Sequence, residues 1–80
     1  STINTVLHAM QELNDWTHYK ELVKCLNTDG KRTSTGRKFS NHIVAQVLST
    51  LKKEGQVHND GHGRWRYGKG PRLLDQVARG

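Results

Sequence analysis

The chain has 80 residues, which indicates one domain near the lower size limit for independent folding. Its 13 Lys and Arg residues against 7 Asp and Glu residues give a net charge of +6, which favours a polyanionic partner. The single cysteine, Cys25, excludes an internal disulfide and therefore a disulfide-stapled secreted scaffold.

The sequence shows neither a membrane-spanning nor a secretory pattern. No apolar run approaches the roughly 20 residues that cross a bilayer, and the N-terminus lacks a basic start and a long apolar stretch. We therefore expect an intracellular protein, in the cytoplasm with the nucleoid or in the nucleus, without a membrane partner. The chain begins at Ser1, so we expect either a removed Met or a domain cut from a longer protein.

The charge is segregated along the chain. Residues 1–30 hold two basic and four acidic residues, whereas residues 31–80 hold eleven basic and three acidic residues. Two stretches contain no acid, 30–53 with six Lys and Arg and 61–74 with four. Random placement would scatter the acids, so this segregation favours a binding face over an ordinary solvated surface.

Two amphipathic helices are predicted in the first third of the chain. Apolar residues recur at helical spacing in residues 2–14: Ile3, Val6, Leu7, Met10 and Leu13. Thr17 is the predicted N-cap of a second helix, which ends around Asn27 and Gly30. The apolar stripe of this helix is Tyr19, Leu22, Val23 and Leu26. Residues 27–38 contain no apolar side chain and two glycines, which predicts a loop.

The third helix carries the most start and stop signals. Ser40 is its predicted N-cap, Phe39 can pack against Val44, and Gly55 stops it. The inward face is predicted to be Val44, Val47, Leu48 and Leu51.

A β-hairpin and a last helix are predicted to follow. Gln56–His58 and 64–67 alternate with period two around the turn-rich loop 59–63. Trp65 and Tyr67 then face the core, while the intervening arginines face outward. Pro71 can open a short final helix, with Leu73, Leu74 and Val77 inward.

The order helix, helix, helix, hairpin resembles that of the winged helix-turn-helix superfamily. The segment Phe39 to Tyr67, FSNHIVAQVLSTLKKEGQVHNDGHGRWRY, carries the resemblance, which covers roughly residues 3–69. It implies an α+β winged helix: a three-helix core, a C-terminal two-stranded hairpin wing and a short C-terminal helix, in a single domain over 1–80. Such folds often have a small third strand, which the stretch at Trp16 is expected to supply.

One subfamily, the Zα domains that bind left-handed DNA, is similar in part. These domains also run from a Val-Leu-x-x-Leu helix through Lys-x-Gly to a Trp on the last strand, here Trp65. They carry an Asn and a Tyr on the helix where this chain has Ala45 and Ser49, and wing prolines where it has glycines and a histidine. These departures argue against binding of left-handed DNA.

The loop over 27–38 departs from the superfamily pattern as well. A helix-turn-helix joins its helices by three or four residues, whereas about twelve are expected here. Either the loop is an insertion that adds basic contacts or the second helix is longer than predicted.

The third helix is the candidate reader of bases. With its apolar face inward, Gln46 can pair with adenine, His42 can reach guanine, and Asn41 lies at the helix start where recognition helices meet base edges. The candidate base contacts are Asn41, His42, Ala45, Gln46, Ser49 and Thr50. The candidate contacts to the DNA backbone are Lys31, Arg32, Arg37, Lys38, Lys53, Arg64, Arg66 and Lys69.

We therefore expect binding of double-stranded DNA, with helix 40–54 in the major groove and wing 56–69 on the backbone or minor groove. The setting is transcription regulation, or site recognition in replication or recombination. The first alternative is a winged helix that binds structured RNA, and the second is a protein-interaction winged helix. The acid-free stretch 30–53 speaks against the second alternative. Target sequence and oligomeric state stay open.

Other chemistry finds little support in the sequence. His58 and His62 flank Asp60, but a structural metal site wants four ligands, so we expect no metal and no cofactor. Cys25 is expected to be a small buried residue of the second helix. No catalytic motif is present, so the chain by itself is not expected to be an enzyme, although it can serve as the DNA-targeting domain of a larger one.

Overall fold

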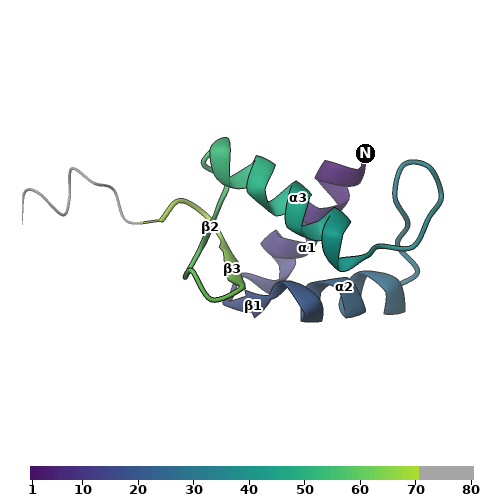
Figure 1. Cartoon of the computed structure of the whole chain (residues 1–80), viewed down its shortest axis with the longest axis horizontal. Helices are drawn as coiled ribbons and strands as arrows, with labels where there is room; N and C mark the ends of the chain where they lie inside the picture. Colours follow the sequence, from purple (N-terminus) through teal and green to yellow (C-terminus); the bar gives the residue numbers. More distant parts are fainter. Residues whose placement is uncertain (71–80) are drawn as a thin grey trace, which may run out of the picture.

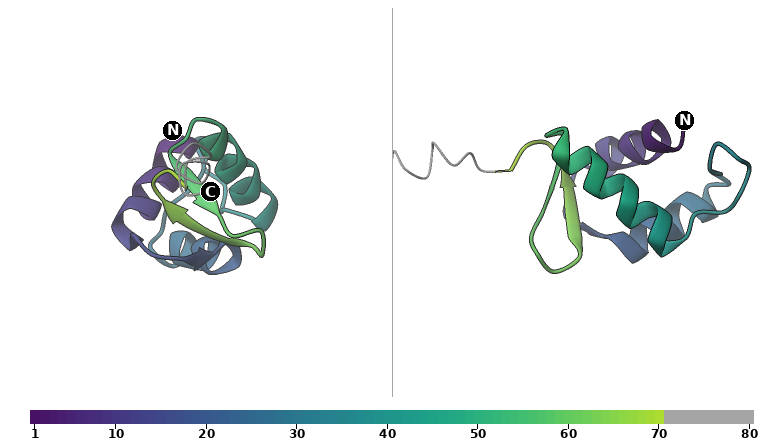
Figure 2. Two further views of the ribbon diagram at one scale, coloured as in Figure 1. Left: turned by 90° about the vertical axis from the view of Figure 1, so that its left-hand side faces the viewer. Right: turned by 45° about the horizontal axis from the view of Figure 1, so that its top comes forward.

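The computed structural model describes residues 1–70, which form a small α+β structure (Figure 1). The helices of this part are α1 (Thr2–Leu13), α2 (Tyr19–Thr28) and α3 (Asn41–Lys53). The strands are β1 (Thr17–His18), β2 (Val57–Asn59) and β3 (Arg64–Tyr67), joined in one antiparallel sheet in the order β1-β3-β2. The sheet closes one end of the three-helix layer (Figures 1 and 2). The helix predicted from Pro71 lies outside the described residues.

The first helix is confirmed, with a narrower buried stripe than predicted. The Ser1 hydroxyl oxygen caps α1 by accepting from the Asn4 N–H (3.2 Å), and Asn14 ends the helix in the left-handed region at φ 45°. Val6 and Met10 are fully buried, whereas Ile3 and Leu13 are exposed. The buried part of the apolar stripe is therefore confined to the middle of α1.

The N-cap of the second helix lies one residue later than predicted. Thr17 pairs with Trp65 in the sheet, so it is part of β1 and does not cap the helix. His18 is the N-cap instead, and its Nδ1 accepts a hydrogen bond from the Lys20 N–H (3.2 Å). The expected third strand is therefore present, directly after Trp16.

The third helix agrees with its sequence signals. The Ser40 hydroxyl oxygen accepts from the Ile43 N–H (3.2 Å), which confirms the N-cap. The helix closes in a Schellman motif at Gly55, which has φ +76°. In this motif the Gln56 N–H donates to the Leu51 carbonyl oxygen (2.9 Å). Gln56 thus belongs to the helix terminus, and β2 starts at Val57, one residue after the predicted start of the strand.

All four predicted core residues of α3 are buried, and they join a core without a buried polar or charged side chain among residues 1–70. The core residues are Val6, Met10, Leu22, Leu26, Phe39, Val44, Val47, Leu48, Leu51, Val57 and Trp65.

The sheet brings Trp65 into this core. Trp65 is 8% exposed, which confirms its predicted inward orientation, and Tyr67 packs against the core from the same face of β3. The Tyr67 hydroxyl oxygen accepts a hydrogen bond from Gln11 Nε2 of α1 (3.2 Å). The arginines of β3 therefore lie on the opposite face of the sheet, away from the core.

The loop between β2 and β3 is anchored to the start of α2. The Gly63 carbonyl oxygen accepts from the Tyr19 N–H (3.0 Å), and Gly63 has φ +86°. A Cβ at this position would lie 2.7 Å from His18 Nε2, so the contact requires glycine. Gly61 in the same loop has φ +81°, but a Cβ there would meet open space.

We predict that Gly63→Ala is more damaging than Gly61→Ala. Both changes place a side chain in the left-handed region, at about 1–2 kcal/mol, but Gly63→Ala also displaces His18 from its cap. Urea denaturation should show a lower free energy of unfolding for Gly63→Ala, by about 1 kcal/mol relative to the matched variant. Equal losses would show that the His18 contact is unimportant.

We also predict that the two tryptophans differ in their contribution to stability. Trp65→Ala should lower the free energy of unfolding by about 3–5 kcal/mol because it empties part of a small core. Trp16→Ala removes an exposed ring and should cost about 1 kcal/mol or less. Thermal melting followed by circular dichroism measures both, and a parent-like melt of Trp65→Ala would contradict the core assignment.

Candidate nucleic-acid interface

The outward face of α3 is a continuous polar surface without acid. His42, Gln46, Ser49, Thr50 and Lys53 are exposed and Ala45 is half-buried. These six residues line one shallow hollow along the helix. The structure therefore brings together the predicted base contacts of α3, apart from Asn41, which is exposed at the helix start outside the lining.

Thr50 has less hydrogen-bonding capacity than its predicted role assumed. Its hydroxyl donates to the Gln46 carbonyl oxygen one turn earlier (3.2 Å). The hydroxyl proton is thus used within the helix, as is common for Thr. Thr50 can therefore accept a hydrogen bond from an amino group of a base, but in this rotamer it cannot donate one to a phosphate.

Cations cluster at the C-terminal end of α3. Lys52 and Lys53 form its last turn, and both are exposed. Lys69 lies against the same end, because a Cβ built on Gly55 would be 3.6 Å from Lys69 Cε. Glu54, the acid next to them, accepts a hydrogen bond from Gln56 Nε2 (3.2 Å).

The structure confirms the predicted long loop between α2 and α3. Helix α2 ends at Thr28, so the loop runs over residues 29–40 and the alternative of a longer second helix is wrong. Asn27 closes its base: Asn27 Nδ2 donates to the Phe39 carbonyl oxygen, and the Phe39 N–H donates to Asn27 Oδ1, both at 2.9 Å. The buried Phe39 ring therefore enters the core at a fixed point.

The outer part of the loop is also ordered by hydrogen bonds. The Thr33 N–H donates to the Arg37 carbonyl oxygen (2.8 Å), which closes a tight turn. The Ser34 N–H donates to the Thr2 hydroxyl oxygen of α1 (2.9 Å). The loop projects from the end of the molecule opposite the sheet (Figures 1 and 2).

The predicted backbone contacts consequently fall into separate groups. Those of the loop, at the N-terminal end of α3, are all exposed: Lys31, Arg32, Arg37 and Lys38. Lys53 and Lys69 lie at the other end of α3, about 20 Å away along a helix of 13 residues. The two groups therefore lie at opposite ends of α3 and do not form one cluster, and Lys31 lines a hollow between α1 and α2.

Arg64 and Arg66 form a third group on the outer face of the sheet. Arg64 is exposed and Arg66 is half-buried. Trp16 and His58 lie beside them, with ring centroids 5.0 Å apart and ring planes at 81°. Trp16 and His58 are not among the predicted site residues, because their proximity depends on strand register and not on any local motif. We call Trp16, His18, His58, Arg64 and Arg66 the outer sheet face.

The residues of the discounted metal site have structural roles. Asp60 Oδ1 accepts from the His62 N–H (2.7 Å) and the Arg64 N–H (3.2 Å), and these hydrogen bonds, led by that from His62, lower the pKa of the Asp60 carboxyl. His58 Nδ1 lies 2.8 Å from the Gly68 carbonyl oxygen, which can only accept, so this nitrogen carries a proton. Within residues 1–70, no group of three or more His, Cys, Asp and Glu residues is placed to hold a metal ion.

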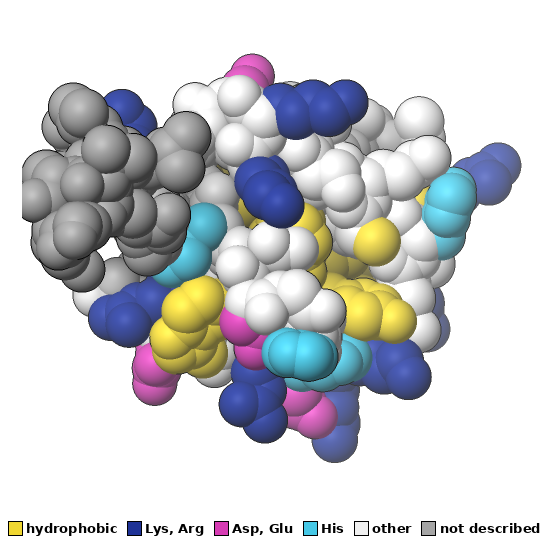
Figure 3. All heavy atoms as spheres, turned by 60° about the vertical axis from the view of Figure 1, so that its left-hand side comes forward, with side chains coloured by type: hydrophobic (Ala, Val, Ile, Leu, Met, Phe, Trp, Pro, Cys, Tyr) yellow, Lys and Arg dark blue, Asp and Glu magenta, His cyan; other side chains and the backbone are white. Residues whose placement is uncertain are grey.

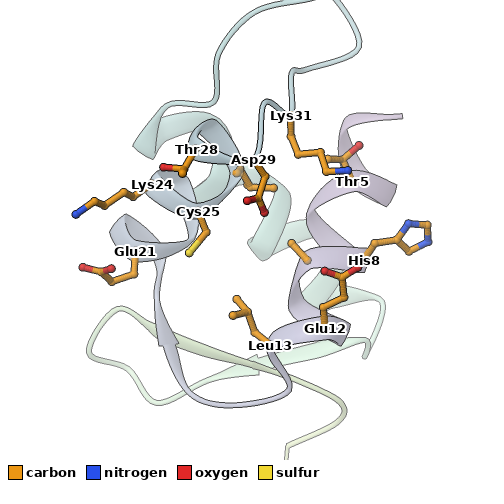
Figure 4. A pocket seen from close by; sticks show the side chains of 12 residues that line it. Thr5, His8, Glu12, Leu13, Glu21, Lys24, Cys25, Thr28, Asp29 and Lys31 are labelled. Carbon is orange, nitrogen blue, oxygen red and sulfur yellow. The ribbon is translucent and has the colours of Figure 1, made fainter.

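A larger hollow of about 680 Å³ lies between α1 and α2 (Figure 4). Cys25 is exposed there, so its predicted burial is wrong: the buried stripe of α2 is Leu22 and Leu26, and the thiol faces the hollow. Its charged lining is of mixed sign: Glu12, Glu21, Lys24, Asp29 and Lys31. No residue of α3 lines it, but Lys31, one of the predicted backbone contacts, does.

Comparison of the chain with protein-family models, curated proteins and solved structures finds no match. Within residues 1–70, no helix is long and apolar enough to cross a bilayer.

We predict that Asn27 holds the basic loop in place. Asn27→Ala removes two partly buried hydrogen bonds and should lower the free energy of unfolding by about 1–3 kcal/mol. Trypsin should also cleave faster after the Lys and Arg residues of the loop. Thr28→Ala, an exposed neighbour, is the matched control, and an unchanged cleavage rate in Asn27→Ala would contradict this role.

Proposed function

We propose that the chain is a winged helix domain that binds double-stranded DNA, with α3 in the major groove and the β2–β3 hairpin as the wing. The observation that carries the proposal is the acid-free outward face of α3, flanked by cations at both ends. In this proposal the domain serves transcription regulation, or site recognition in replication or recombination.

The dimensions of α3 suit a groove of B-form DNA. A helix with its side chains is about 10–12 Å across and fits a major groove about 12 Å wide. Gln46, near the middle of the exposed face, can donate to N7 and accept from N6 of adenine. His42 and Ser49 lie one turn before and about one turn after it, so each can meet a neighbouring base pair.

The flanking cations suit the two backbones that border such a groove. Lys53 and Lys69 are near one end of α3, and the loop cations are near the other. Phosphate contacts fix the position of a protein on the duplex without reading sequence. In this arrangement α3 reads the bases, and the loop and the wing hold the phosphates.

The same features favour DNA over the RNA alternative. The major groove of an A-form helix is too deep and narrow for side chains to read. A helix face with amide, imidazole and hydroxyl groups would have no base edges to reach there. A winged helix that binds proteins tends to expose an apolar or acidic surface. The outward face of α3 has neither acids nor large apolar side chains.

The salt dependence of binding tests the nucleic-acid class. If about four to six phosphate contacts form, log K for duplex DNA should fall with log salt at a slope of about −4 to −5. Fluorescence anisotropy with labelled duplex measures this slope, and an unlabelled RNA hairpin should compete poorly. A slope near zero would remove nucleic acid as the partner.

Two variants test which residues read sequence. On duplexes selected from a random library, Gln46→Ala should lose about 1–3 kcal/mol at one base pair and bind other sequences as before. Lys53→Ala should weaken all duplexes about equally, and Lys24→Ala on α2 should change little. A uniform loss from Gln46→Ala would mean that α3 does not read bases.

A further inference from the structure

The strand register places the side chains of Trp16, Arg66 and His58 in one row on the outer sheet face. His58 of β2 pairs with Arg66 of β3, and the pairing of Thr17 with Trp65 puts Trp16 opposite Arg66 on the other side of β3. The Trp16 ring crosses this strand to reach His58. All three side chains therefore lie on the face opposite the buried Trp65.

The indole of Trp16 is held in place although it is 40% exposed. The backbone N–H of Trp16 donates to Asp15 Oδ1 (2.7 Å), which fixes the backbone before β1. The His58 imidazole, nearly perpendicular to the indole, is itself anchored to the Gly68 carbonyl. An exposed ring with a fixed orientation costs little entropy to bind a flat partner.

Charged side chains of both signs surround the ring. Arg64 and Arg66 lie on the same face, and Arg66 is directly opposite His58 in the register. The nearby carboxylates of Asp15 and Asp60 each accept backbone N–H groups. Figure 3, which brings the sheet end forward, shows hydrophobic surface bordered by Lys, Arg and His side chains and also by Asp and Glu side chains.

We propose that the outer sheet face binds an unpaired nucleotide of DNA, whose base stacks on Trp16 and whose phosphate is held by Arg64 and Arg66. A stacking platform beside cations is the usual arrangement for single strands. A duplex keeps the faces of its bases stacked on each other, so Trp16 can engage only a base that has left the helix. This site goes beyond the proposed duplex binding and does not depend on it.

The test uses a ten-residue oligothymidylate and the fluorescence of the unaltered protein. Stacking should quench the exposed Trp16 and protect it from acrylamide, while the buried Trp65 should respond little. Trp16→Ala should bind this oligonucleotide about 5- to 150-fold more weakly, and Trp16→Phe should recover part of the loss. Ile3→Ala, which removes a side chain of 39% exposure at the far end of α1, is the matched control and should bind normally.

Three results would overturn the site. One is parent-like affinity of Trp16→Ala for the oligonucleotide, which would leave charge alone as the cause of binding. Another is binding without any change in tryptophan fluorescence or acrylamide protection, which needs no variant to observe. The third is equally tight binding of an oligoglutamate peptide of the same charge, which would indicate an acidic protein partner.

Blunt duplex DNA separates this proposal from duplex binding. Trp16→Ala should bind a blunt duplex within about twofold of the parent, since α3 is unaltered. If the parent binds oligothymidylate through Trp16 but no duplex, the proposed duplex function fails and this site stands. A tenfold loss of both in a folded Trp16→Ala would overturn the assignment of a separate site.

Discussion

β3 is the one strand of the sheet with a neighbour on each side, and the insertion of its Trp65 into the core holds the sheet against the helices. Trp65 pairs with Thr17 on one side and Asn59 on the other. Strands of two to four residues cannot form a stable sheet in water by themselves. The burial of this one indole therefore stabilises three strands and, through Gly63 and Tyr19, the start of α2.

The same strand has an aromatic face toward the core and a basic face on the outside. Its inner side chains, Trp65 and Tyr67, join Phe39 in supplying the aromatic area of the core. Its outer side chains, Arg64 and Arg66, lie on the face that water reaches. Their charged groups therefore stay hydrated and carry little desolvation cost. A register slip of one residue would exchange the two sets, so the pairing with β1 and β2 decides both the stability and the surface of this end.

The sequence predicts those elements whose determinants are local. Ser40, Gly55 and the spacing of Val44 and Leu48 specify the start, end and inward face of α3 within one continuous segment, and the structure confirms them. The outward face then follows from the helical period, which is why its polar residues lie together as expected.

The errors came from contacts between distant segments. Thr17 was predicted to cap α2 because its pairing with Trp65, 48 positions away, has no signal in either segment. Trp16 and His58 were missed as neighbours for the same reason. The loop cations and Lys69 were grouped by sign of charge, but only the fold shows that the length of α3 separates them.

The two hydrogen bonds between Asn27 and Phe39 close the base of the loop between these residues. They keep the end of α2 and the entry to α3 at a fixed separation, whatever the chain does beyond them. Because closure entropy grows only with the logarithm of length, doubling such a loop costs about 0.6 kcal/mol. The helices and the loop are therefore free to evolve separately: residues 31–38 can lengthen, shorten or change charge while the orientation of α3 is preserved.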